Sequence, residues 1–300
     1  AAVSYKKEFI DKSGLKDPVA KMLAAGAADY ITKRNSTDSK SMIAGYPFFG
    51  DWGRDTMIAI AGCAIVTGQY QTVREILRSF MSYCKDGLMP NMFPEENEEP
   101  IYNTVDASLL FIEVVYLYYQ ASGDNEFVKE ALPVMESIIK NYTDGTEYGI
   151  YMDNDGLIAA GKDLWQVTWM DVRYEDILPT KRHGKPVEIN AYWYNALKIM
   201  EEFSDDDNKK KHYSEMAAKT KDSFLRLFWD EKRGYLKDVI SGEDDEEQIR
   251  CNQVWALSMS FVMLDQDKAL KILDVIYKHL YTPWGLRSLS PEDREYHGFY

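Results

Sequence analysis

Apolar residues at helical spacing recur in one segment of this chain after another, and this pattern constrains the fold more than any other feature. The segments lie at residues 17–33, 55–67, 70–84, 104–122, 125–142, 188–203, 208–229, 249–263 and 266–281. A period near 3.6 residues predicts a helix in each segment. In segment 104–122, Leu109 and Ile112 share one stripe, while Leu110 and Phe111 make the other side apolar. This pattern predicts a helix buried on more than one face.

The connections between these segments alternate between short and long. Gly68-Gln69 and Ser122-Gly123-Asp124 are tight turns, whereas residues 35–52, 85–103 and 143–187 are long linkers rich in Pro, Gly and aromatic residues. Helical hairpins joined tightly at one end and loosely at the other are typical of a ring of helix pairs whose long loops gather on one face. The alternative is an open solenoid of hairpins that binds a protein, but solenoids repeat at a fixed sequence period, and we find none.

One stretch, residues 148–160, has the pattern of strands. Short apolar runs flank the turn sequence Asp153-Asn154-Asp155-Gly156, which predicts a small β-hairpin within the long loop. The acidic runs at residues 204–207 and 243–247 are interpreted as solvated loop or helix-cap residues.

Composition and charge narrow the class of partner. The chain has 300 residues, of which 45% are apolar and 13% aromatic, so one large domain or two small ones are allowed and ring area remains for a pocket. Its formal net charge of −14 repels polyanions. We therefore expect neither nucleic acid nor an anionic membrane as a partner, and a neutral ligand fits better.

The sequence also bears on location and cofactors. It lacks an apolar run near the ~20 residues that span a bilayer, and it lacks a signal peptide, which favours a soluble protein. The odd set Cys63, Cys84 and Cys251 is typical of reduced core thiols and favours the cytoplasm. The four histidines are scattered without ligand spacing, so we expect no metal site, and nucleotide or dinucleotide fingerprints are missing. We expect no cofactor. Because the chain lacks an initiator Met and ends after a turn, we expect a fragment of a longer chain.

The segment Gly45–Thr56 has the composition of a sugar-binding site. Within Gly45-Tyr46-Pro47-Phe48-Phe49-Gly50-Asp51-Trp52-Gly53-Arg54-Asp55-Thr56, aromatic rings, glycines, an arginine and two carboxylates converge before an apolar helical run. Rings stack on the apolar face of a pyranose, and Arg and Asp bind its vicinal hydroxyls. The alternative is a helix N-terminus capped by Asp51 or Asp55, with Trp52 as core filler.

Other long loops carry the same pairing of aromatic residues with carboxylates or amides. It recurs in Tyr102–Asp106, Trp165–Asp171 and Glu188–Trp193, and the repetition favours a carbohydrate cleft. Two of these acids have alternative explanations, because Asp106 can cap its helix and Glu188 lies at a helix start, where the dipole favours a carboxylate.

Asp171 is the candidate general acid. It follows Trp165, Trp169 and Met170, and apolar rings disfavour ionisation and raise the pKa of a carboxyl group. The alternative is a buried ion pair with Arg173. Because nucleophile motifs such as Gly-x-Ser-x-Gly are absent, hydrolysis by paired carboxylates is the remaining candidate reaction.

These motifs together resemble the amylo-α-1,6-glucosidase domain of glycogen debranching enzymes. The resemblance rests on residues 45–56, 102–107, 168–171 and 184–190, and it continues through Asn252-Gln253 and residues 282–291. It implies an all-α fold, an (α/α)6 toroid or six-hairpin barrel, formed by residues 1–300 as a single domain whose last helices lie beyond residue 300. It also implies inverting hydrolysis of an α-1,6-linked glucosyl residue from an α-glucan such as glycogen or limit dextrin.

By the same resemblance, Asp171 would be the general acid. The residues that would bind the terminal glucose are Trp52, Arg54, Asp55, Asp106, Trp169, Glu188 and Asn190. Inversion requires a second carboxylate about 6.5–9.5 Å from the acid, and the resemblance places this base beyond the end of the chain. It leaves open an upstream domain in the parent protein. The alternatives are a glucoamylase-like or trehalase-like enzyme for another linkage, and a glucan-binding fragment without turnover.

Overall fold

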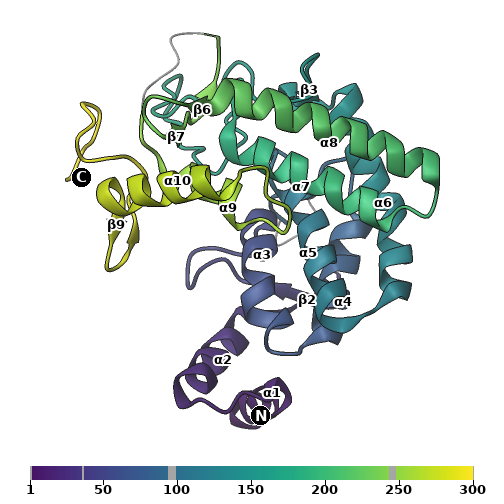
Figure 1. Cartoon of the computed structure of the whole chain (residues 1–300). Helices are drawn as coiled ribbons and strands as arrows, with labels where there is room; N and C mark the ends of the chain where they lie inside the picture. Colours follow the sequence, from purple (N-terminus) through teal and green to yellow (C-terminus); the bar gives the residue numbers. More distant parts are fainter. Residues whose placement is uncertain (1, 36, 94–98, 243–247, 300) are drawn as a thin grey trace. The chain divides into compact units, whose positions relative to one another are not determined.

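The computed structural model describes residues 2–35, 37–93, 99–242 and 248–299. Helices dominate these residues, and the strands are short (Figure 1). The sequence-based prediction of an all-α fold with a small β-hairpin in a long loop is therefore confirmed. The chain divides into two compact units, Ala1–Ile138 and Ile139–Tyr300. The assignment of all 300 residues to a single domain remains a prediction.

The described residues of unit 1 form helices and a β-hairpin. Its elements are α1 (Ala2–Ser13), α2 (Pro18–Tyr30), β1 (Ile31–Arg34), β2 (Ser39–Met42), α3 (Gly53–Ile60), the π-helical turn η1 (Ala61–Ile65), α4 (Tyr70–Ser82), α5 (Ala107–Ser122) and most of α6 (Asn125–Asp144). Helix α5 packs against α3 and α4. Buried side chains cover several faces of α5, including Leu109, Leu110, Phe111 and Ile112, so the prediction of a core helix over this segment is confirmed.

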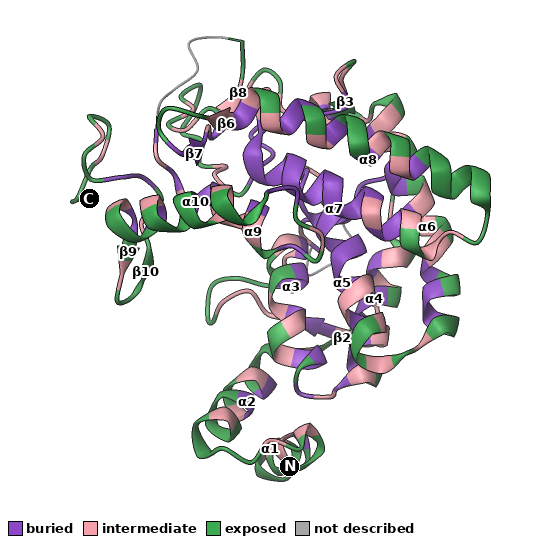
Figure 2. Ribbon diagram, in the orientation of Figure 1, coloured by how far each residue is buried: buried purple, intermediate pink, exposed green. Residues whose placement is uncertain are grey.

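Unit 2 is built around the hairpin of α7 and α8. Its elements are the 3-10 turn η2 (Glu147–Gly149), β3 (Tyr151–Met152), β4 (Ile158–Ala159), β5 (Lys185–Pro186), α7 (Val187–Phe203), α8 (Asp207–Phe228), β6 (Trp229–Asp230), β7 (Tyr235–Leu236), β8 (Val239–Ile240), the 3-10 turn η3 (Cys251–Val254), α9 (Trp255–Ser258), α10 (Gln266–His279), β9 (Tyr281–Thr282) and β10 (Gly285–Leu286). Helix α7 is buried along nearly its whole length, whereas α8 exposes one side (Figure 2).

The connections alternate as predicted. Few residues separate α5 from α6 or α7 from α8, whereas residues 83–106 join α4 to α5 and residues 145–186 join α6 to α7. The acidic run at residues 204–207 caps α8, because the Asp206 carboxylate accepts hydrogen bonds from the backbone N–H groups of Asn208 and Lys209 at 2.8 and 3.1 Å. That interpretation is confirmed, and the run at residues 243–247 lies outside the described residues.

The predicted hairpin at residues 148–160 is confirmed. Strands β3 and β4 are antiparallel, with Tyr151 opposite Ala159. The turn between them is held by α7 and α8, because Trp193 Nε1 and Thr220 Oγ1 both donate to the Gly156 carbonyl, at 3.2 and 2.9 Å.

The first helix was predicted over residues 17–33, and its predicted end is wrong, since residues 31–33 belong to a strand. Helix α2 stops at Tyr30, because Ile31 is extended with φ −88° and ψ 114°, a conformation that β-branched side chains favour. Strand β1 then pairs with β2 from Ile31 opposite Met42 to Arg34 opposite Ser39. The prediction that residues 148–160 are the only strand-like stretch is therefore also wrong.

The predicted helix over residues 249–263 is shorter and irregular. Only Trp255–Ser258 is α-helical, after the 3-10 turn η3. The Gln253 amide explains part of the difference: it accepts from the Leu236 N–H at 3.2 Å and donates to the Arg250 carbonyl at 3.1 Å, and such side-chain bonds compete with regular helix. Helix α1 is not predicted by the sequence pattern because, of its described side chains, it buries only Phe9.

Within the described residues, no helix is long and apolar enough to cross a membrane. The three cysteines form no disulfide, in agreement with the prediction of reduced thiols, but they are half-buried and not core residues.

The start of α3 requires glycine, which leads to a testable prediction. A Cβ atom on Gly53 would lie 2.0 Å from the Pro90 carbonyl oxygen, whereas one on Gly50, in the same motif, would meet nothing within 4 Å. We expect Gly53→Ala to lower the free energy of unfolding by about 1–3 kcal/mol, because the backbone at Gly53 or Pro90 must move to admit the Cβ atom. Gly50→Ala is the control and should change it by less than about 0.5 kcal/mol. Urea denaturation measures both, and equal effects would contradict the close approach.

Candidate active site

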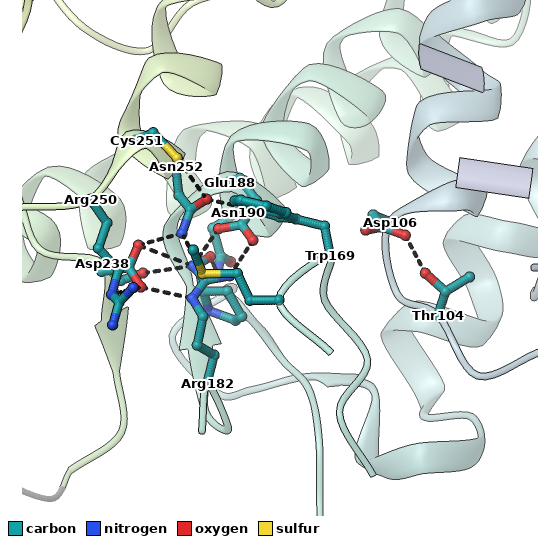
Figure 3. Close-up of polar contacts among 12 residues, drawn as sticks. Thr104, Asp106, Trp169, Arg182, Glu188, Asn190, Asp238, Arg250, Cys251 and Asn252 are labelled. Carbon is teal, nitrogen blue, oxygen red and sulfur yellow. Dashed lines mark hydrogen bonds and ion pairs between the residues drawn. The ribbon is translucent and has the colours of Figure 1, made fainter. Parts of the chain in front are cut away.

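A buried cluster of charged side chains lies where β5 meets α7 (Figure 3). Strands β5 and β8 pair with Pro186 opposite Val239, and the Val187 N–H donates to the Asp238 carbonyl at 2.9 Å. This short ladder brings Glu188, in the first turn of α7, beside Asp238. Arg182, which precedes β5, completes the cluster. The strands are too short to add much stability, but they fix which residues meet.

Arg182 joins both carboxylates. Its two terminal nitrogens donate to the two Glu188 oxygens, with Nη2–Oε2 at 2.6 Å, and its Nε donates to Asp238 Oδ2 at 2.7 Å. The side chains of Arg182, Glu188 and Asp238 are 2%, 1% and 6% exposed. The planar guanidinium thus uses its fork of donors on two acids at once, a geometry that lysine cannot reproduce.

The electrostatics of the cluster follow from its burial. Burial disfavours a charged Arg182, but the negative charges of Asp238 and Glu188 outweigh it and raise the pKa of Arg182. Burial raises the pKa of Glu188, and the charge of Arg182 opposes that shift. Burial also raises the pKa of the nearby Cys251 thiol to about 11, and Asp238 and Glu188 add to the shift. Cys251 is therefore a poor nucleophile at neutral pH.

Asn252, in η3, connects this cluster to Trp169. Its Nδ2 donates to Asp238 Oδ1 at 2.7 Å, and its Oδ1 accepts from the Trp169 indole Nε1 at 2.6 Å. The same Nδ2 lies 3.6 Å from Met170 Sδ. Two consecutive residues of the long loop before α7 are therefore tied to one buried amide.

Asp171 follows directly in this loop and is half-buried. The rings expected around it are partly exposed, with 45% of Trp165 and 39% of Trp169 accessible. The alternative partner Arg173 donates from Nε to the Glu175 carbonyl at 2.7 Å. The role of Asp171 as the general acid remains a prediction, and its loop presents a carboxyl group beside exposed aromatic surface.

Two predicted sugar ligands of unit 2 are fully buried. Glu188 and Asn190 are both 0% exposed. Asn190 binds the β-hairpin: its Oδ1 accepts from the Ile158 N–H at 2.7 Å, and its Nδ2 donates to the carbonyls of Ile158 and Pro186 at 3.1 and 2.9 Å. Both donor hydrogens of this amide are thus used on backbone groups.

In unit 1 the structure brings Arg54 and Asp106 together. Arg54 Nε donates to Asp106 Oδ2 at 2.5 Å and Nη2 donates to Thr104 Oγ1 at 2.9 Å. Thr104 also donates to the other oxygen of Asp106. Asp106 holds the N-cap position of α5 but makes no side-chain capping bond, so the capping explanation is wrong. Its carboxylate serves the arginine instead.

The remaining predicted residues of unit 1 lie at the start of α3. Trp52 is the N-cap residue, makes no side-chain capping bond and is half-buried. Asp55 is exposed at a pocket of about 300 Å³ whose lining is mostly apolar. Asp51 does not cap α3 either, because its carboxylate forms a buried ion pair with Arg34. The alternative that Asp51 caps the helix is therefore wrong.

Arg182 and Asp238 were not predicted from the sequence. Arg182 stands in the polar run Lys181-Arg182-His183, which reads as a solvated loop. Asp238 lies 56 residues further along the chain from Arg182. A local pattern carries no signal for such a pair, because it forms only through the β5–β8 ladder.

The buried pair in unit 1 can be tested by stability. Asp106→Ala removes the carboxylate from Arg54, whose side chain is 12% exposed, and should lower the free energy of unfolding by about 3–5 kcal/mol. The matched control is Glu130→Ala, which breaks the Arg78–Glu130 pair, whose side chains are 47% and 41% exposed, and should cost about 0–1 kcal/mol. Thermal and urea unfolding give both values. Similar losses in the two variants would show that the Arg54–Asp106 pair behaves as a surface pair.

The family model described as amylo-alpha-1,6-glucosidase matches residues 25–300. The glycogen debranching enzyme of Saccharomyces cerevisiae is 24% identical, over 87% of this chain and 23% of the yeast protein, so the chain spans about a quarter of that relative. A rhamnosidase from Klebsiella oxytoca with rhamnose bound is a similar solved structure, with a TM-score of 0.48, 19% identity and coverage of 68% of this chain and 37% of that chain. Because the family model covers most of its length, the chain belongs to the amylo-α-1,6-glucosidase family, a family of glycoside hydrolases, as the sequence motifs predicted.

Proposed function

We propose that this chain is an inverting glycoside hydrolase that removes an α-1,6-linked glucosyl residue from glycogen or a limit dextrin, with Asp171 as the general acid. Family membership over residues 25–300 supports the substrate class. The observation that carries the assignment of the acid is local. Asp171 is half-buried and directly follows Trp169 and Met170, which are bound to a buried amide.

In the proposed reaction, the Asp171 carboxyl donates its proton to the glycosidic oxygen as the bond to the sugar's anomeric carbon breaks. A water molecule attacks that carbon from the opposite side and loses a proton to a second carboxylate. The products are free glucose with inverted configuration and the shortened glucan.

Accessible aromatic side chains in each of the two units support a carbohydrate substrate. In unit 2 the Trp169 ring, 39% exposed, offers a face on which a pyranose can stack, and its orientation is set by the bond to Asn252. In unit 1 Trp52 and the exposed Asp55 offer a ring and a carboxylate at the start of α3. We propose direct sugar contacts for these three residues.

We propose a different role for the other predicted ligands. Glu188 and Asn190 have no accessible surface, and Arg54 and Asp106 bind each other. A sugar hydroxyl would have to open these buried bonds to reach them, at the cost of leaving a polar group unsatisfied. We propose that Arg54 and Asp106 hold the backbone that carries Trp52 and Asp55 in unit 1. We propose that Glu188 and Asn190 support the part of unit 2 that carries Asp171.

Asp171→Asn tests the assignment in the purified protein. Its carboxamide has nearly the same shape but cannot donate an acidic proton, so kcat on a limit dextrin with single-glucosyl α-1,6 branches should fall about 10²–10⁴-fold. On α-glucosyl fluoride the loss should be much smaller, because fluoride leaves without needing a full proton. Asp176→Asn is the control, since Asp176 is an exposed acid of the same loop.

The outcomes are distinct. Unchanged hydrolysis by Asp171→Asn would overturn the acid assignment, and an equal loss on both substrates would assign Asp171 to binding. If the unsubstituted protein hydrolyses maltose or trehalose faster than the α-1,6 branch, a glucoamylase-like or trehalase-like specificity replaces the proposed one. Binding of glucan without any release of glucose would make the chain a binding module.

A further inference from the structure

The loop that carries Asp171 is fixed by a side chain far away in the sequence. Asn252 lies 83 residues after Trp169, yet its amide oxygen accepts the indole N–H of Trp169. Trp169 is 39% exposed, whereas Asn252 is 1% exposed. One end of the contact thus lies in the interior of unit 2, and the other reaches the surface.

The amide of Asn252 has only one favourable orientation. The Asp238 oxygens accept from Asn252 and Arg182, and an indole N–H can only donate. Asn252 must therefore point Nδ2 at Asp238 and Oδ1 at Trp169, as it does at 2.7 and 2.6 Å. A flipped amide would place oxygen against carboxylate and donor against donor. The chemistry of its two neighbours locks this side chain.

The groups behind Asn252 are themselves held by ion pairs. Asp238 is held by Arg182, and Arg182 is held by both oxygens of Glu188. Glu188 lies in the first turn of α7, a core helix. A continuous series of hydrogen bonds therefore runs from α7 through Arg182, Asp238 and Asn252 to Trp169.

We propose that Asn252 is a positioning residue for the reaction, which acts through the Trp169 indole to set where the loop presents Asp171. Trp169 and Asp171 are two residues apart, so their Cα atoms are at most about 7 Å from each other. A rotation or shift of Trp169 therefore moves the acid. Met170, which lies between them, contacts the same amide. The inference rests on the proposed role of Asp171.

The consequence is a loss in kcat, with little change in KM. A displacement of about 1 Å of a catalytic group can cost about 10²-fold in rate. We therefore expect Asn252→Ala to lower kcat on the branched dextrin by about 10²-fold. Trp169→Phe keeps an aromatic ring but removes the indole N–H, and should lower kcat in the same way. Because Trp169 is partly exposed, this variant should remain folded even if Asn252→Ala does not.

The matched control is Asn195→Ala. Asn195 is a similarly buried amide on α7, and its Oδ1 accepts from the Phe261 N–H at 2.9 Å. Asn195→Ala should lower the melting temperature about as much as Asn252→Ala while leaving kcat near that of the parent. A purely structural role for Asn252 would make the two variants alike in both measurements.

A double-mutant cycle completes the test. If Asn252 acts through the indole N–H, then Asn252→Ala should cost little in the Trp169→Phe background, because the bond is already absent. Additive losses in kcat would overturn the proposed route. Equal kcat for Asn252→Ala and Asn195→Ala would overturn the positioning role. Failure of this inference can be told apart from failure of the acid assignment, because Asp171→Asn is assayed alongside, and full activity of that variant would overturn the acid assignment on which the inference rests.

Discussion

The buried charge of Arg182 determines how the segments of unit 2 around it are arranged. A guanidinium does not lose its proton in a protein, so at 2% side-chain exposure it must meet acids. Glu188 and Asp238 supply two negative charges, and Arg250, with its Nε 3.9 Å from Asp238 Oδ2, supplies a second positive one. Two cations and two anions thus balance. The pairing fixes the start of α7 against β8, and it holds Asp238 where it binds Asn252.

Buried carboxylates at helix starts are bound by arginines in unit 1 as well. Asp51 precedes α3, Asp106 is the N-cap residue of α5 and Glu188 lies in the first turn of α7. Each of these carboxylates is buried and bound by an arginine from another segment. A helix N-terminus favours a negative charge, and the arginine makes burial of that charge tolerable. Such pairs add little net stability compared with apolar side chains, but they specify which loop meets which helix.

Much of the fold followed from the sequence because helix formation is local. The 3.6-residue period located the main helices, and the alternation of short and long connections was visible in the positions of glycine and proline. Local patterns failed where long-range partners decide the conformation. Ile31 is extended because β2 pairs with it, and residues 251–254 tighten into a 3-10 turn where Gln253 bonds to Leu236.

The candidate site was predictable in residue type but not in contacts. Aromatic residues beside carboxylates marked the loops around Asp106, Asp171 and Glu188. The sequence indicated that Asp106 and Glu188 lie at helix starts, but it gave no means to identify their arginine partners. Arg182 and Asp238 lack any local signature, because a short β-ladder brings them together. The support of a site is thus less visible in sequence than its exposed residues.

We expect the Arg182 cluster to hold the loop that carries Asp171 in place. Arg182→Lys tests it most directly, because lysine keeps the charge but cannot bind Glu188 and Asp238 with a planar fork. Amide hydrogen exchange should accelerate in residues 163–173 and 248–254, while residues 70–82, in helix α4 of unit 1, exchange as before. Unchanged exchange in the loop of the folded variant would contradict the claim.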